Sequence, residues 1–206
     1  MKYPDFFRDV PRLQVYEPLA AFLGAAENGL LEYGYEDAVK LAGHSCPTVA
    51  SAYALGCRAL AMLYPDRLPE RGGVRIEFAN SQEDGVTGVI ASILTLLTGA
   101  ATGGGFKGIG GRFVRRDPLH FAVKLPMSLR FTRIDNGAAV DAAIDLARVP
   151  PDTKTAELMA RCLQGKADAA EQQQFGELGQ RRVARILLEH WNDNEVFQLR
   201  PVHPQI

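Results

Sequence analysis

Apolar residues follow a helical repeat through the first part of the chain, and a repeat of this kind predicts amphipathic helices. The first helix is expected over residues 15–31, with its entry near Pro18 and a looser turn toward its C-terminal end. A shorter helix is expected over residues 35–42, because Gly43 follows it and helices commonly end at a glycine.

A third helix is expected over residues 47–63. Pro47 suits the first helical position, where no backbone N–H is needed, and this makes Cys46 the N-cap residue. Small residues recur along the helix and would allow a neighbour to pack closely against it: Ala50, Ser51, Ala52, Ala54, Gly56, Ala59 and Ala61.

The middle of the chain combines one alternating segment with one long apolar segment. Residues 74–80 alternate apolar and polar side chains, which predicts a β-strand. Ser81 and Asp84 then stand at capping-box spacing and indicate the start of a buried helix that continues to about Thr98. After a glycine-rich loop, strands are expected over residues 112–116, 120–125 and 129–135, and residues 138–147 fit either a strand or a short helix.

The character of the chain changes near residue 150. Asp152 precedes a helix expected over 153–163, which Gly165 ends, and residues 168–191 are expected to form a longer amphipathic helix. We therefore expect an α+β fold in which N-terminal helices pack on a mainly antiparallel sheet, followed by a C-terminal helical hairpin.

Length and composition fit one domain with an extension. A chain of 206 residues can build a single core, and 47% hydrophobic with 23% charged residues is typical of globular proteins. Residues 1–149 are interpreted as the α+β domain, and residues 150–206 as a helical extension packed on the same domain.

The charge balance argues against two classes of partner. A net charge of -1 gives no indication of nucleic-acid binding. The uncharged stretch over residues 85–106 is long enough for a membrane span, but its six glycines favour a buried helix followed by a loop. One basic cluster fits a solvated sheet edge or a phosphate site: Lys107, Arg112, Arg115 and Arg116.

The three cysteines and the N-terminal segment indicate a cytoplasmic setting. An odd number of widely spaced cysteines favours reduced thiols over a disulfide framework. The first residues carry charges and prolines where a signal peptide needs an apolar run.

The segment GHSCP, residues 43–47, holds the most specific chemistry in the sequence. A thiol at a helix N-terminus faces free backbone N–H groups and the positive end of the helix dipole, and both favour thiolate. His44, two residues before Cys46, can reach the same volume, and thiolate with neutral imidazole suits zinc or another divalent transition metal. The pair also fits a nucleophile and its base, or a buried cysteine beside a backbone-bonded histidine, and spacing alone leaves all three open.

Few other residues are placed to complete a metal site. Cys57 lies about 16 Å along the helix from Cys46 and is expected in the core. Glu83 and Asp84 stand where a strand gives way to a helix. They fit the role of helix caps, and they also fit a site shared with His44 and Cys46, directly or through water.

The loop over residues 98–111 contains the pattern G-x-G-x-x-G from Gly103 to Gly108. The dinucleotide fingerprint needs a strand before it and a helix after it, whereas this loop follows a helix and precedes strands. What remains is a loop whose backbone can approach a ligand or another chain closely and favour an anion. The candidate ligand-binding residues are Gly103, Gly104, Gly105 and Lys107.

Two motifs together resemble the family of the E-type subunits of formylmethanofuran dehydrogenase and their free-standing relatives. These are GHSCP at 43–47, followed by the small-residue helix, and TGAATGGG at 98–105, in the family's order and approximate separation. The resemblance covers about residues 15–135. It implies an α+β domain, commonly dimeric, with a metal site, often zinc, that uses His44 and Cys46.

The chain departs from the family's pattern at several positions. Ala42 stands where the family often has a second histidine, and Thr48 where it usually has glycine. A cysteine typical of the threonine-glycine element is replaced by Ala100 or Ala101, the cysteine-x-x-aspartate element is not evident, and the C-terminal zinc ribbon of some members is missing. The resemblance therefore implies a divergent member with a thin ligand set and argues against redox use of paired cysteines.

Three functions follow as hypotheses, and the sequence names no substrate or reaction for any of them. The first is a cytoplasmic, homodimeric metal-binding protein that holds zinc through His44 and Cys46, with water, Glu83 or Asp84, or a partner-chain residue completing the site. The second is a small-molecule or anion-binding module whose ligand lies between the loop at 103–105 and the start of the Cys46 helix. The third is an enzyme that uses Cys46 as a nucleophile.

Overall fold

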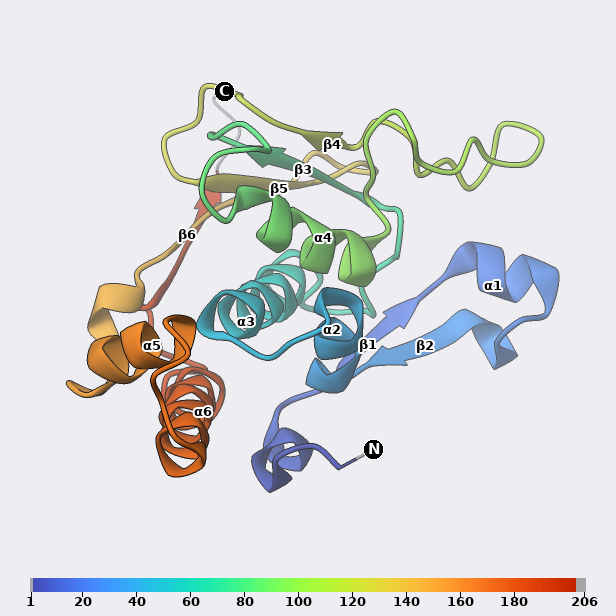
Figure 1. The fold of residues 1–206 in the computed structure, drawn as a ribbon. Coiled ribbons are helices and arrows are strands. Elements are labelled where there is room, and N and C mark those ends of the chain that lie inside the picture. The colour runs from blue at the N-terminus through green and yellow to red at the C-terminus, as the bar shows by residue number, and fades with distance from the viewer. Residues whose placement is uncertain (1, 203–206) are drawn as a thin grey trace.

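A five-stranded sheet with helices against it forms the body of the protein in the computed structural model, which describes residues 2–202 (Figure 1). The strand order is β4-β3-β5-β6-β7, and of these neighbours only β3 and β4 pair in parallel. The predicted α+β fold with a mainly antiparallel sheet is confirmed. The strands are β3 (Val74–Phe78), β4 (Leu119–His120), β5 (Leu129–Arg133), β6 (Ala139–Ile144) and β7 (Phe197–Val202).

Helices α3 (Pro47–Leu63) and α4 (Thr87–Thr98) pack on one face of this sheet (Figure 1). The start of α3 at Pro47, with Cys46 as N-cap, agrees with the sequence prediction. The two helices lie close together at Gly56, where an added Cβ would come within 2.9 Å of the side chains of Leu94 and Leu97. The small residues of α3 therefore serve the close packing that their spacing predicted.

The N-terminal part of the chain contains a two-stranded hairpin where one helix was expected over 15–31. Strands β1 (Leu13–Tyr16) and β2 (Leu30–Tyr33) pair antiparallel, and α1 (Pro18–Leu23) occupies only the start of the connection. Gly24 ends α1 in the left-handed conformation with φ of 65°. Asn28, inside a 3₁₀ turn at Glu27–Gly29, is also left-handed. The prediction was wrong because the pairing of β1 with β2 outweighs the helical repeat.

Helix α2 (Tyr35–Ala42) follows the hairpin and agrees with the sequence prediction, and a short 3₁₀ turn precedes the hairpin. Helix α2 ends at Gly43, which has φ of 76°, as predicted. A 3₁₀ turn at Asp5–Asp9 precedes β1.

Helix α4 begins later than its capping pattern predicted, at Thr87 instead of near Ser81. Asp84 accepts a hydrogen bond from the backbone N–H of Ser81 at 3.0 Å, which closes a turn, and Gly85 then takes a left-handed φ of 54°. The predicted end at Thr98 is confirmed, with Gly99 in the left-handed region.

The strands expected after α4 are shorter or absent. Residues 112–116 lie in an irregular loop, because Phe113 and Asp117 have φ of 61° and 68°, which a regular strand does not allow. The strand expected over 120–125 is reduced to β4, while β5 agrees closely with the prediction over 129–135.

The C-terminal part contains the predicted helical hairpin and one unpredicted strand. Helix α5 (Thr155–Leu163) packs on α6 (Ala169–Ala184), which continues as a π-helical turn at Arg185–Glu189. Strand β7 then pairs with β6 at the edge of the sheet. Residues 138–147, left open by the sequence, form β6 followed by a 3₁₀ turn at Leu146–Arg148.

The core lies between the sheet and the pair α3 and α4. Its largest fully buried side chains include Tyr53 of α3, Ile76 of β3, Phe131 of β5 and Leu94 of α4. The Tyr53 hydroxyl lies 2.8 Å from the carbonyl oxygen of Pro11 and 3.0 Å from that of Tyr33, so its single proton is shared between them and ties the hairpin to the core. Between residues 2 and 202, no helix combines the length and apolar character that crossing a membrane requires.

Candidate functional site

The segment that carries His44 and Cys46 links α2 to α3. Cys46 has an extended backbone, with φ of −148° and ψ of 168°, and lies at the N-terminus of α3. Its side chain is half-buried and makes no capping hydrogen bond to the helix. The thiol is therefore placed beside the free N–H groups of a helix of 17 residues without being engaged by them.

The imidazole of His44 is exposed and is oriented by the backbone. Its Nδ1 lies 2.9 Å from the carbonyl oxygen of Ala42. Because a carbonyl only accepts hydrogen bonds, Nδ1 carries the proton in a neutral ring and Nε2 keeps the free lone pair. Metal-binding histidines commonly show this arrangement, in which one ring nitrogen donates to a backbone carbonyl and the other binds the ion.

Ser45, between the two candidate ligands, is anchored to two other helices. Its hydroxyl lies 2.9 Å from the Tyr35 hydroxyl and donates to Gln180 Oε1 of α6 at 2.9 Å. Gln180 Nε2 donates in turn to the Ser45 carbonyl oxygen at 3.1 Å. Burial raises the pKa of Tyr35, so its phenol stays neutral. These bonds hold the segment in place, and no local pattern in the sequence pointed to Gln180.

The remaining candidate ligands lie apart from this pair. Across residues 2–202, no three side chains of His, Cys, Asp or Glu gather closely enough to hold one metal ion. Glu83 and Asp84 are exposed in the turn before α4, and they form no such group with His44 and Cys46. Cys57 is 7% exposed in the core, as expected, and burial raises the pKa of its thiol to about 12.

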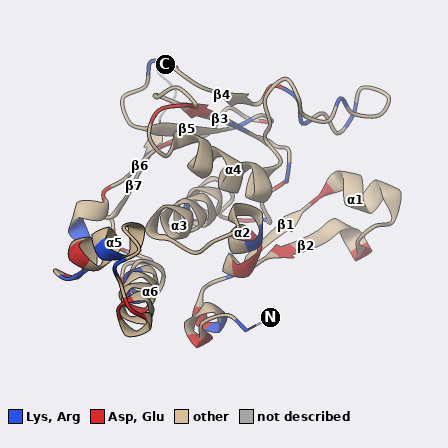
Figure 2. Cartoon of the chain, viewed as in Figure 1, with Lys and Arg blue, Asp and Glu red and all other residues tan. Residues whose placement is uncertain are grey.

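Arg115, one of the four residues of the predicted basic cluster, belongs to a buried ion-pair network with Glu17 and Arg71. Arg115 is 8% exposed and donates to Glu17 Oε1. Arg71 donates to Glu17 Oε2 at 2.9 Å and, through Nε and Nη2, to the carbonyl of Leu96 at 3.2 Å. Of the two alternatives for the basic cluster, the solvated sheet edge is wrong for Arg115, which is buried against Glu17, a partner 98 positions away in sequence. Lys107, Arg112 and Arg116 are exposed, and Figure 2 shows basic residues along this loop.

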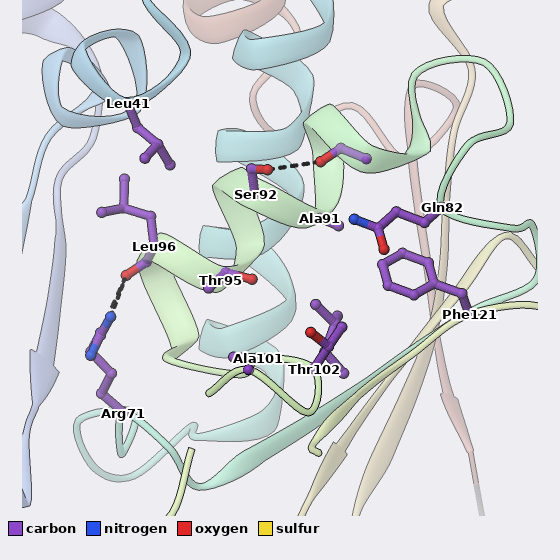
Figure 3. A pocket seen from close by; sticks show the side chains of 13 residues that line it. Leu41, Arg71, Gln82, Ala91, Ser92, Thr95, Leu96, Ala101, Thr102 and Phe121 are labelled. Carbon is purple, nitrogen blue, oxygen red and sulfur yellow. Dashed lines mark hydrogen bonds between the residues drawn. The ribbon is translucent and has the colours of Figure 1, made fainter. Parts of the chain in front are cut away.

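A groove runs along the outer face of α4 and has a volume of about 510 Å³ (Figure 3). Ser92 and Thr95 of α4 form one wall, and Thr102 and Gly104 of the glycine loop form another. Of the four predicted loop residues, only Gly104 lines it; Gly103, Gly105 and Lys107 do not.

The sequence suggested a ligand between the loop at 103–105 and the start of the Cys46 helix, and this groove lies elsewhere. The start of the Cys46 helix contributes no lining residue among those described. Leu41, at the end of α2, is the lining residue that lies nearest to His44 in sequence.

Comparison with known proteins identifies no family. No protein-family model matches the chain, and a search of curated proteins finds no match. The resemblance to the E-type subunits of formylmethanofuran dehydrogenase stays a prediction that rests on the two motifs.

Proposed function

We propose that this protein binds a metal ion, zinc or another divalent transition metal, through His44 and Cys46. The observation that carries the proposal is the bond from His44 Nδ1 to the Ala42 carbonyl, which leaves Nε2 free to bind an ion. The uncapped thiol of Cys46 lies two residues away, at the N-terminus of α3.

Among residues 2–202, each chain then offers two ligands, which is fewer than a structural zinc site requires. Zinc takes four ligands in such sites and three protein ligands with a water in most catalytic sites. Water or residues of a second chain would complete the coordination. An ion held in this way would supply an open position for a bound water or an anionic ligand.

Metal analysis of protein prepared without a histidine tag tests the proposal. We expect wild-type protein to retain more than half an equivalent of zinc per chain, and Cys46→Ser and His44→Ala to weaken zinc binding by at least about 100-fold, because each removes one of two ligands. Cys162→Ser is the matched control, since Cys162 lies on α5 and is also only half-buried.

Equal zinc binding by wild type and Cys46→Ser would contradict the proposal. Absence of zinc from wild type, combined with selective alkylation of Cys46 over the buried Cys57, would instead favour the nucleophile hypothesis.

We also propose that the protein is a homodimer whose interface involves two projections from the body. The first is the α1 arm, residues 16–31, and the second is the glycine loop, residues 102–116 (Figure 1). They contact each other through the rings of Phe22 and Phe113, with centroids 5.2 Å apart. Both expose large apolar side chains, which commonly marks an interaction surface. These are Phe22, Leu23, Leu30, Phe106, Ile109 and Val114.

Sedimentation analysis of paired variants tests the dimer. We expect wild type to sediment as a dimer and the double variant Phe22→Ser with Leu23→Ser as a monomer, because both side chains are more than half exposed and contribute little to the core. Leu163→Ser is the control, since Leu163 is 81% exposed on α5, outside the two projections. A monomeric wild type, or a variant that stays dimeric, would exclude this interface.

A further inference from the structure

We propose that the groove along α4 binds a small organic anion whose carboxylate or phosphate group contacts Arg71 and whose apolar body lies on α4 and Phe121. This inference is independent of metal binding at His44 and Cys46, because the groove is lined by other residues. It gives the ligand an apolar body and a charged contact at Arg71, and it places the ligand away from the start of the Cys46 helix, where the sequence had suggested it.

The groove has the size and the mixed lining of a small-molecule site. Its volume of about 510 Å³ lies within the usual range for such sites. Figure 3 shows Leu41, Leu96 and Arg71 toward one end and Gln82 and Phe121 toward the other, with α4 between them. An elongated molecule with one polar end therefore matches this arrangement. The hydroxyls of Ser92, Thr95 and Thr102 lie along its length.

The charge of the groove selects an anion. Of the described residues that line it, only Arg71 is charged. Arg71 shares the single carboxylate of Glu17 with Arg115, so the three side chains carry a formal charge of +1. Within residues 2–202, neither Arg71 nor Arg115 forms an ion pair with a second carboxylate. A ligand anion would neutralise this excess.

The guanidinium of Arg71 has donors left for a ligand. Three of its five N–H groups are engaged, two by the Leu96 carbonyl and one by Glu17. One N–H on each of Nη1 and Nη2 remains, and the side chain is 22% exposed. Because Glu17 and Leu96 already fix the guanidinium, a charge-assisted hydrogen bond to a ligand requires little further ordering.

The test uses 4-phenylbutyrate, a carboxylate with an aromatic body, and 4-phenylbutanol, which has the same body without the charge. Both are titrated into full-length protein in the presence of a chelator, with binding followed by amide NMR shifts. We expect a Kd of about 1 mM for the carboxylate, as ordinary ligand efficiency gives for a molecule of this size. We expect the alcohol to bind at least about 10-fold more weakly, since it cannot form the charge-assisted bond.

Two variants and one control locate the site. Ser92 is exposed, so Ser92→Phe should fill the groove without disturbing the core and abolish the binding. Arg71→Gln should weaken it by at least about 10-fold. Arg67→Gln, which removes an exposed arginine paired with Asp135 outside the groove, should leave it unchanged.

The proposal is overturned by equal affinity for the carboxylate and the alcohol, by absence of binding, or by binding that Ser92→Phe leaves intact. If Arg71→Gln does not fold, the outcome for Ser92→Phe decides the matter alone. Because a chelator is present throughout, failure here leaves the metal proposal unaffected, and failure of metal binding leaves this one unaffected.

Discussion

Replacement of Glu17 by alanine is expected to lower the free energy of unfolding by about 3–5 kcal/mol, because it leaves two arginines without their shared carboxylate in a buried setting. Glu17 is 5% exposed, and Arg115, which has no other carboxylate among the ion pairs of the described residues, is 8% exposed. Glu17 also caps α1 by accepting from the Leu19 N–H at 3.0 Å, and that contribution is lost as well. Urea unfolding followed by circular dichroism gives the difference directly.

A second variant at Glu17 tests its charge, and a variant elsewhere in the α1 arm serves as the control. Glu17→Gln keeps the size and an acceptor oxygen but loses the charge, so we expect most of the destabilisation to remain. Glu27→Ala removes an exposed carboxylate from the same arm and should change stability by less than about 0.5 kcal/mol. A Glu17→Ala protein as stable as Glu27→Ala would show that the buried ion-pair network does not stabilise the fold.

Replacement of Gly56 by leucine is the second large effect, with an expected loss of about 3 kcal/mol. A Cβ at this position would stand 2.8 Å from Leu97 Cδ1 and 2.9 Å from Leu94 Cδ2, and both leucines are fully buried. A larger side chain must therefore push α3 and α4 apart, and overpacking of this kind commonly costs about 1–3 kcal/mol or more. Thermal or urea unfolding measures the change.

Gly176→Leu provides the matched control within a helix. Gly176 lies in α6, is exposed, and has no atom within 4 Å of an added Cβ. Leucine should stabilise this position by about 0.5–1 kcal/mol, because it has a better helix propensity than glycine. Destabilisation of similar size by both substitutions would argue against close contact at Gly56.

The elements that the sequence predicted well depend on signals a few residues apart. Helix α2 ends at Gly43 because glycine readily takes the left-handed conformation seen there, and α3 begins at Pro47 after Cys46 because proline fixes φ at a helical value. The small residues of α3 predicted a close neighbour, which is α4, although they did not identify it.

The elements that the sequence missed depend on partners far away in the chain. Residues 13–16 are extended because residues 30–33 pair with them, and a helical repeat in one segment does not reveal that pairing. Strand β7 contains Pro201, which weakens its strand signal. Proline is tolerated there because β7 is an edge strand, and the backbone groups on its outer side need no partner strand.

In the candidate site, too, local signals could be predicted from the sequence and distant partners could not. His44 and Cys46 were found from a motif of five residues, and the structure places them in one link between α2 and α3. Gln180, which holds Ser45 between them, lies 135 positions away. The pairing of Arg115 with Glu17 spans 98 positions, and this is why neither alternative for the basic cluster, a solvated edge or a phosphate site, included a buried ion pair.

The position of β7 also affects the order in which the sheet is completed during synthesis. The strand that β7 covers, β6, leaves the ribosome before the whole α5–α6 hairpin, and at ordinary translation rates the gap is several seconds. Throughout that interval the nascent sheet has an unpaired edge at residues 139–144, an arrangement that invites pairing with other chains. Closure by β7 is a non-local step and is therefore slow. When residues 197–202 dock, they cover this edge and β7, which carries Pro201, becomes the edge strand in its place.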